Sequence, residues 1–217
     1  MNTAGNVKGI CVRTLVVMLG VIICGVSVGL FKLVELGADP YTVMNTAISA
    51  CIGMQFGTLQ LLVNIGLFVL VIAFKREFIG FGTIFCMVFL GYTADFVMWL
   101  TRDIQEVFTE GMLRFPVLAV SVVLLGLGAA LYASANMGMS PYDCLAYILE
   151  EQTKGKISFQ SGRIITDVFS VCAGFLFALM TGIQWKIIGI GTILLAVATG
   201  PLIRFFRVRF DKLLAGI

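Results

Sequence analysis

The feature that most constrains this chain is a motif that occurs twice, each time directly after a long apolar segment. The first copy is Gly37-Ala38-Asp39-Pro40-Tyr41 and the second is Gly138-Met139-Ser140-Pro141-Tyr142. In each copy a residue that can cap a helix, Asp39 or Ser140, precedes a proline, and proline is favoured at the first position of a helix. Each motif therefore predicts a long helix that ends, a break led by glycine, and a new helix that starts at the proline.

The composition indicates an integral membrane protein. Of the 217 residues, 59% are hydrophobic and only 12% are charged, which leaves too little polar surface for a water-soluble globule. The apolar segments are long enough to cross a hydrocarbon core as helices, and they lack the alternation of a membrane barrel. We therefore expect an all-α polytopic protein with full spans at about 11–34, 57–74, 79–100, 115–135, 160–181 and 185–203.

Two shorter helices, about 41–53 and 142–152, are expected after the Pro-Tyr motifs. At 1.5 Å per residue a helix of this length covers only about 18 Å, so neither can cross the membrane alone. We expect each to be a re-entrant or broken helix.

Further matches predict an internal duplication. The spaced pair Gln60 and Asn64 in the first half corresponds to Arg163 and Asp167 in the second. A glycine pair followed by threonine opens a span in each half; its members are Gly80, Gly82 and Thr83, and Gly189, Gly191 and Thr192. Matches of three kinds in the same order predict a first repeat over 1–106 and a second over 107–217, within a single transmembrane domain. Such duplications are typical of membrane transporters.

The basic residues predict that both termini are cytoplasmic. With re-entrant short helices, only Lys32, Arg102, Arg114 and Lys186 of the 15 Lys and Arg residues fall outside, which obeys the positive-inside rule. Parallel halves satisfy the rule equally well and stay open. The inverted arrangement is favoured because it keeps the charged tip of the second short helix at the surface from which the chain entered.

The order of these features is similar to that of small bacterial membrane proteins of the YczE/YyaS/YitT type. The pattern is a first span with spaced glycines, G-x-x-P-[WY], a short helix, a span, and a further span led by G-x-G-T, and it covers nearly the whole chain. The resemblance implies a polytopic protein of the bacterial plasma membrane that is often labelled a transporter. It names no substrate.

The two helix starts are candidate substrate sites because free backbone N–H groups favour an anionic group. Asp39 would satisfy these donors itself, so a cation or proton is expected near Asp39 and an anionic moiety near Ser140. Tyr41 and Tyr142, which follow the prolines, are included in the candidate site. The alternative is that both starts are ordinary caps at the membrane surface.

Polar residues inside apolar segments are the other candidates. Arg163 and Asp167, four residues apart, can pair on one helix face, and Gln60 and Asn64 occupy the equivalent face. Arg163 can instead be an interfacial anchor with Asp167 as its local partner. Asp95 has no nearby cation in the sequence and is a candidate for substrate or proton coupling, or for a place near the outer headgroups.

We predict that Asp39, Asn64, Asp95, Ser140 and Asp167 approach a common polar cavity between the repeats. The expected function is small-molecule transport, with the lipid bilayer, an unidentified substrate and a coupling proton or Na⁺ as partners, and no nucleic acid. The alternative is a substrate-binding or assembly subunit of a larger membrane complex. An enzyme is not expected, because histidine is absent and no nucleophile has an adjacent base. No cofactor or metal is expected, and the six cysteines are read as small packing residues.

Cysteine accessibility in intact cells tests the topology. Single cysteines at Lys75 and Glu110 should label from opposite sides of the membrane, with Lys75 cytoplasmic, because inverted halves place them at opposite ends. An external position for Lys75 with a cytoplasmic Glu110 would establish parallel halves instead.

Overall fold

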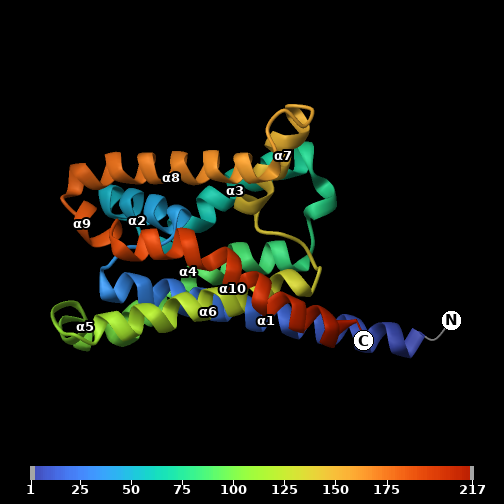
Figure 1. Ribbon diagram of the computed structural model, residues 1–217, viewed down its shortest axis with the longest axis horizontal. Coiled ribbons are helices and arrows are strands. Elements are labelled where there is room, and N and C mark those ends of the chain that lie inside the picture. Colours follow the sequence, from blue (N-terminus) through green and yellow to red (C-terminus); the bar gives the residue numbers. More distant parts are fainter. Residues whose placement is uncertain (1–2, 216–217) are drawn as a thin grey trace.

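The computed structural model describes residues 3–215, and these residues form helices and connecting turns without a strand. The all-α prediction is confirmed. Six helices are long and apolar enough to cross a membrane (Figure 1): α1 (Thr3–Val34), α3 (Phe56–Phe74), α4 (Phe81–Thr101), α6 (Arg114–Ser134), α8 (Phe159–Thr181) and α10 (Ile190–Leu214).

Shorter helices connect these six. The Pro-Tyr motifs start α2 (Pro40–Ile52) and α7 (Pro141–Gln152), as predicted. The remaining pieces are the 3-10 turns η1 (Arg76–Phe78) and η2 (Arg102–Ile104) and the helices α5 (Gln105–Glu110) and α9 (Gln184–Ile187). The predicted last span at 185–203 is wrong at its start, because the chain leaves the helical conformation between α9 and α10 and Gly189 is extended.

The two short helices begin with different caps. The Asp39 carboxylate accepts a hydrogen bond from the Thr42 backbone N–H at 3.1 Å, the usual geometry of an N-cap. Ser140 occupies the same place before α7, but its side chain makes no capping hydrogen bond. The break before each helix turns through a glycine with positive φ, +107° at Gly37 and +111° at Gly138, where a residue with a Cβ is strained.

Each break is bound by the G-x-G-T segment of the other half. The Gly191 N–H donates to the Leu36 carbonyl at 2.8 Å, and the Gly82 N–H donates to the Met137 carbonyl at 2.7 Å. A Cβ on Gly37 would lie 2.6 Å from the Thr192 hydroxyl, and a Cβ on Gly138 would lie 2.5 Å from that of Thr83. These positions therefore need glycine both for the turn and for the close approach.

The centre of the fold is the antiparallel pair α1 and α6. Ser27 donates to the Ser121 carbonyl at 2.7 Å, and Arg13 donates to the Ala135 carbonyl at 3.3 Å, which fixes the opposite directions of the two helices. Glycines let the backbones meet, because a Cβ on Gly128 would lie 2.8 Å from the carbonyl oxygen of Gly20. α4 packs on the other side of α1, and α10 packs on α6.

The second short helix returns to the end of the molecule where α6 ends. α1 begins and α10 ends at this same end, and the charged turn after α7 projects from it (Figure 1). There the Lys75 ammonium contacts Glu151 at 2.7 Å and Glu77 at 3.0 Å. The hydrogen bonds to Glu151 and then to Glu77 raise the pKa of Lys75, so this side chain stays charged at neutral pH.

Inverted halves predict that α1 and α6 run in opposite directions and that the two helix breaks make matching contacts. The structure has both features. The duplication itself, and the division at residues 106 and 107, stay predictions, because matched contacts do not establish a common origin.

Replacement of Gly128 with alanine should destabilise the fold by about 1–3 kcal/mol, because the new methyl group meets backbone atoms of α1 that cannot move aside. Thermal unfolding of the purified protein in detergent measures this. Gly66→Ala is the matched control, since a Cβ there meets nothing within 4 Å and helix propensity favours alanine by up to about 1 kcal/mol. Equal stability of the two variants would contradict the close contact.

Candidate functional site

The tyrosines of the two motifs meet between the halves. The rings of Tyr41 and Tyr142 stack with their centroids 4.3 Å apart and an angle of 22° between their planes. Both side chains are buried, although they come from the first turns of different short helices. The two helix breaks therefore converge on one point of the interior.

Each tyrosine hydroxyl bonds to the polar residue of the span that follows it. Tyr41 donates to the Asn64 side-chain oxygen of α3 at 2.8 Å, and Tyr142 donates to the Asp167 carboxylate of α8 at 2.7 Å. Tyr142 also lies 3.2 Å from the Ser170 hydroxyl. Tyr41, Asn64, Tyr142 and Asp167, all predicted as site residues, thus form one connected cluster.

Arg163 carries the positive charge of this cluster. Its guanidinium pairs with Asp167 at 3.4 Å, which confirms the predicted i, i+4 pair, and it also bonds to Asp143. The guanidinium carbon lies 5.0 Å from the centre of the Tyr142 ring, within the range of a cation–π contact. One guanidinium therefore serves two carboxylates and an aromatic ring.

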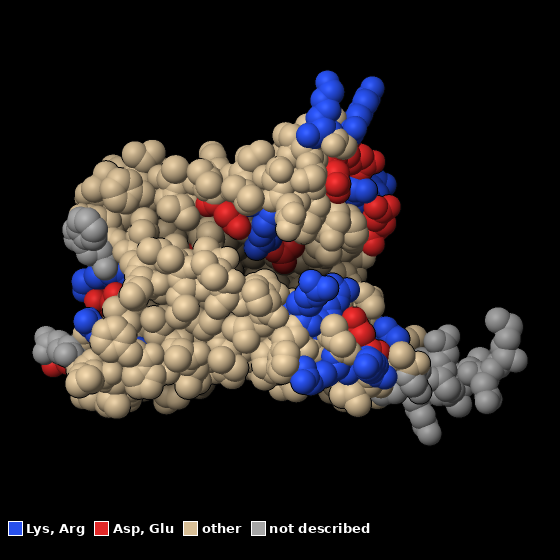
Figure 2. All heavy atoms as spheres, in the orientation of Figure 1, with Lys and Arg blue, Asp and Glu red and all other residues tan. Residues whose placement is uncertain are grey.

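The ion cluster is open to one side. The side chains of Arg163, Asp143 and Asp167 are 38%, 40% and 31% exposed. Figure 2 shows charged side chains of both signs in the hollow between α8 and α10, within a surface that is otherwise largely uncharged. This opening faces the flank of the helix bundle.

Asp39 and Ser140 flank the cluster at the starts of α2 and α7. Asp39 is used as a cap and lies within electrostatic range of Arg163 and Asp167. The Ser140 side chain does not bond to the first N–H groups of α7, and Asp143 places a carboxylate in that same first turn. A free anion at Ser140 would therefore meet the field of Asp143.

Asp95 lies apart from this cluster. Its carboxylate accepts a hydrogen bond from the Gly57 N–H at 2.7 Å and lies 3.5 Å from the Lys32 ammonium of α1. No cation lies near Asp95 in the sequence, and the fold brings Lys32 to it from a distant part of the chain. Lys32 also lies 4.0 Å from the centre of the Phe56 ring.

Gln60 is buried where α3 crosses α4. A Cβ on Gly91 would lie 2.7 Å from the Gln60 side-chain oxygen, so the amide fills the space that this glycine leaves. That oxygen accepts no hydrogen bond from the residues that the structure describes. Gln60 thus shares a helix with Asn64 but packs toward a different neighbour.

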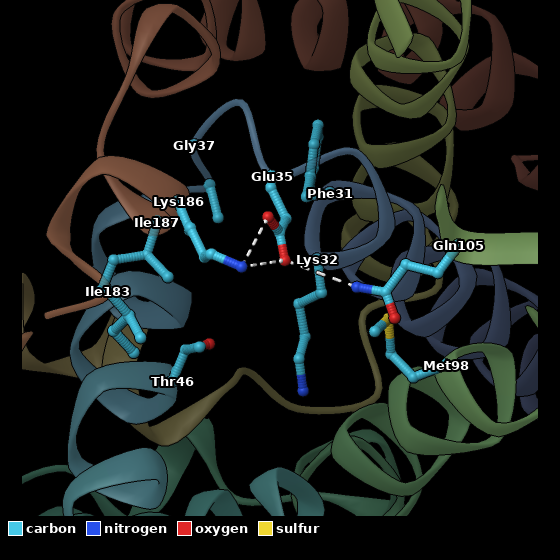
Figure 3. A pocket seen from close by; sticks show the side chains of 11 residues that line it. Phe31, Lys32, Glu35, Gly37, Thr46, Met98, Gln105, Ile183, Lys186 and Ile187 are labelled. Carbon is cyan, nitrogen blue, oxygen red and sulfur yellow. Dashed lines mark hydrogen bonds and ion pairs between the residues drawn. The ribbon is translucent and has the colours of Figure 1, made fainter. Parts of the chain in front are cut away.

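A cavity of about 250 Å³ lies at the first helix break, at the end of the molecule that carries α5 and α9. Figure 3 shows its lining, in which Glu35 is bonded to Lys186 and Gln105. Lys32 also lines it and connects it to Asp95. The cavity lining consists of Phe31, Lys32, Glu35, Gly37, Ala38, Thr46, Met98, Gln105, Ile183, Lys186 and Ile187.

Sequence reasoning missed several polar residues of both regions. Asp143 carried a usable signal, because an acidic residue in the first turn of a helix beside a break is a polar group at membrane depth. Lys32, near the end of the first span, was assigned only to the outer side. Nothing in the sequence indicates that Glu35 and Lys186 form an ion pair, because they lie at the ends of elements far apart in the chain.

Six spanning-length apolar helices with charged residues held between them define a multi-pass membrane protein. The chain belongs to DUF6198, a family of unknown function whose model matches residues 11–208. The predicted resemblance to YczE-type and YyaS-type proteins is confirmed by this match and by the relatives.

The relatives are similar in length but carry no functional name. The uncharacterised membrane protein YczE of Bacillus subtilis (strain 168) is 26% identical over 78% of this chain and 73% of its own. The uncharacterised protein YyaS of the same organism is 26% identical over 87% and 89% of the two chains. An uncharacterised protein of Haemophilus influenzae is 24% identical over 85% and 78%. No solved structure matches the chain.

Removal of the Tyr142 hydroxyl should cost more stability than removal of the Tyr41 hydroxyl. Tyr142→Phe breaks a hydrogen bond to a carboxylate, worth about 1.5–3 kcal/mol, whereas Tyr41→Phe breaks one to an amide, worth about 0.5–1.5 kcal/mol. Denaturant unfolding in detergent measures both. A double-mutant cycle with Asp167→Asn should give a coupling energy for the Tyr142 pair, and additivity would contradict the contact.

Proposed function

We propose that this protein is a transporter of a small organic molecule in the bacterial plasma membrane, with both termini in the cytoplasm. The substrate would pass between the two halves at the paired Pro-Tyr breaks. The observation that carries this proposal is the stack of Tyr41 on Tyr142, which brings two interrupted helices together in the interior. Interrupted helices that meet near the middle of a bundle are how many secondary transporters build their substrate sites.

The charged residues of the interior support the same function. Charges among membrane-spanning helices are costly, and they are retained chiefly where they serve a substrate or ion pathway. Arg163 with Asp143 and Asp167 lies beside one break, and Lys32 with Asp95 lies beside the cavity at the other. A pathway between the halves would therefore pass both ion clusters.

The direct experiment is reconstitution of the purified protein into liposomes. Uptake of labelled small metabolites is compared with that of protein-free liposomes, with and without a pH gradient or a Na⁺ gradient. Uptake that depends on the protein supports a transporter. A folded protein that transports none of the panel, and that co-purifies with a stable partner subunit from native membranes, would favour the alternative of an assembly subunit.

The two helix caps provide variants for this assay. Asp39→Ala should cost about 0.5–2 kcal/mol of stability because it removes a capping bond, whereas Ser140→Ala should cost less because Ser140 makes none. If substrate binds at the start of α7, Ser140→Ala should instead weaken the apparent affinity for the transported substrate. Unchanged uptake kinetics in a normally stable Ser140→Ala protein would remove Ser140 from the site.

Asp95→Asn tests the coupling role predicted for Asp95. Proton-driven uptake should be lost while the folded fraction and substrate exchange persist, because the amide keeps the shape and removes only the titratable charge. Normal proton-driven uptake by this variant would place Asp95 outside the coupling mechanism.

A further inference from the structure

The cavity at the first helix break has the size and surface of a site for a small organic molecule. Its volume of about 250 Å³ is below the roughly 300–1,000 Å³ of pockets that hold drug-sized ligands. Phe31, Met98, Ile183 and Ile187 provide apolar walls from α1, α4 and the α9 region. The few polar groups among these walls therefore decide which ligands fit.

The polar groups on one side of the cavity already have partners. Both carboxylate oxygens of Glu35 contact the Lys186 ammonium, at 3.2 and 3.1 Å, and Gln105 donates to the same carboxylate at 3.4 Å. These three side chains come from the turn after α1, from α9 and from α5, and they link these elements around the cavity (Figure 3). The Glu35 carboxylate is therefore satisfied within the protein, and the Lys186 side chain, which is 58% exposed, also faces solvent.

Lys32 and Thr46 are the polar groups left for a ligand. In Figure 3 the Thr46 and Lys32 side chains lie on either side of the same part of the cavity. The buried Thr46 hydroxyl has no hydrogen-bond partner among the residues that the structure describes. Lys32 has one carboxylate partner, Asp95, at 3.5 Å, which leaves donors of its three N–H bonds available.

We propose that this cavity binds a small monocarboxylate with an apolar tail. The carboxylate would accept hydrogen bonds from the Lys32 ammonium and the Thr46 hydroxyl, and the tail would lie against Phe31, Met98 and Ile187. This inference rests on the proposed function only in treating the bound molecule as cargo. The binding site itself follows from the cavity.

The charges around Lys32 also predict that binding of the ligand is coupled to uptake of a proton. Asp95 faces the Lys32 ammonium from α1 and the Gly57 N–H from α3, while Glu35 and Lys186 balance each other in the cavity wall. A ligand carboxylate beside Lys32 would add an uncompensated negative charge to a low-dielectric site, which is costly. Binding of the ligand is therefore accompanied by one proton, which moves from solvent onto the Asp95 carboxylate and leaves Lys32 paired with the ligand.

The experiment measures equilibrium binding of 4-methylpentanoate to the purified protein by calorimetry in buffers of different ionisation enthalpy. The expected result is saturable binding with uptake of about one proton per ligand, and an affinity that falls as pH rises. The matched amine, 3-methylbutylamine, should not bind. Binding of the amine in place of the acid, or binding of the acid without proton uptake, would overturn the proposal.

Four variants test whether the ligand binds beside Lys32. Lys32→Gln should weaken binding at least about tenfold, because a charge-assisted hydrogen bond is lost, while the control Lys75→Gln should leave binding unchanged. Asp95→Asn should keep binding but abolish proton uptake and the dependence on pH. Because Lys32→Gln alone removes the cation paired with Asp95, the double variant Lys32→Gln with Asp95→Asn, which removes both charges, is measured as well. Wild-type affinity in the folded double variant would overturn the site.

The assay separates this inference from the proposed function. Binding and proton uptake in detergent without transport in liposomes would support the cavity and count against a transporter. Transport of other molecules by a protein that does not bind 4-methylpentanoate or related acids would retain the transporter and reject the carboxylate site.

Discussion

The structure depends on how the backbone is satisfied at its two helix breaks. A break inside a membrane protein exposes N–H and carbonyl groups that lipid cannot satisfy, so the protein must supply partners. Here the Gly191 N–H donates to the Leu36 carbonyl and the Gly82 N–H donates to the Met137 carbonyl. Each donor lies in the G-x-G-T segment of the opposite half. Neither break can form correctly until the other half is in place. The same contacts set the positions of Tyr41 and Tyr142, so the assembly of the halves and the geometry of the site have one cause.

The sequence was sufficient wherever the determinants are local. Proline and its preceding cap mark the starts of α2 and α7, hydropathy marks the spans, and the spacing of Arg163 and Asp167 predicts their pairing. The pairing of Lys32 with Asp95 and of Asp143 with Arg163 joins different helices, and a single sequence contains no signal for such contacts. The start of the last span was misplaced for a related reason. Gly189 leaves the helix to meet the Leu36 region, and only the tertiary contact reveals that need.

The two ion clusters share one arrangement, in which a single cation is bound to carboxylates of the protein. Lys32 is paired with Asp95, and Arg163 is paired with Asp143 and Asp167. An anionic substrate can replace a protein carboxylate at such a cation only if that carboxylate gains a proton or another cation. A proton and a carboxylate that move together carry no net charge. In the proposed transport, passage of the pair past both clusters would therefore avoid the large cost of moving a bare charge through a low-dielectric interior.

The two halves differ in one respect that bears on how a pathway could open. In the first half α3 packs on α4, with Gly57 bonded to Asp95 and Gly91 against Gln60. In the second half α8 makes no comparable packing with α10, and a Cβ on Gly200 of α10 meets nothing within 4 Å. The charged residues of α8 face this gap. If the halves are inverted equivalents, exchange of these two arrangements would open α3 from α4 and close α10 onto α8. Such an exchange would break the packing of α3 on α4, while α1, α6 and the interlocked breaks could stay in place.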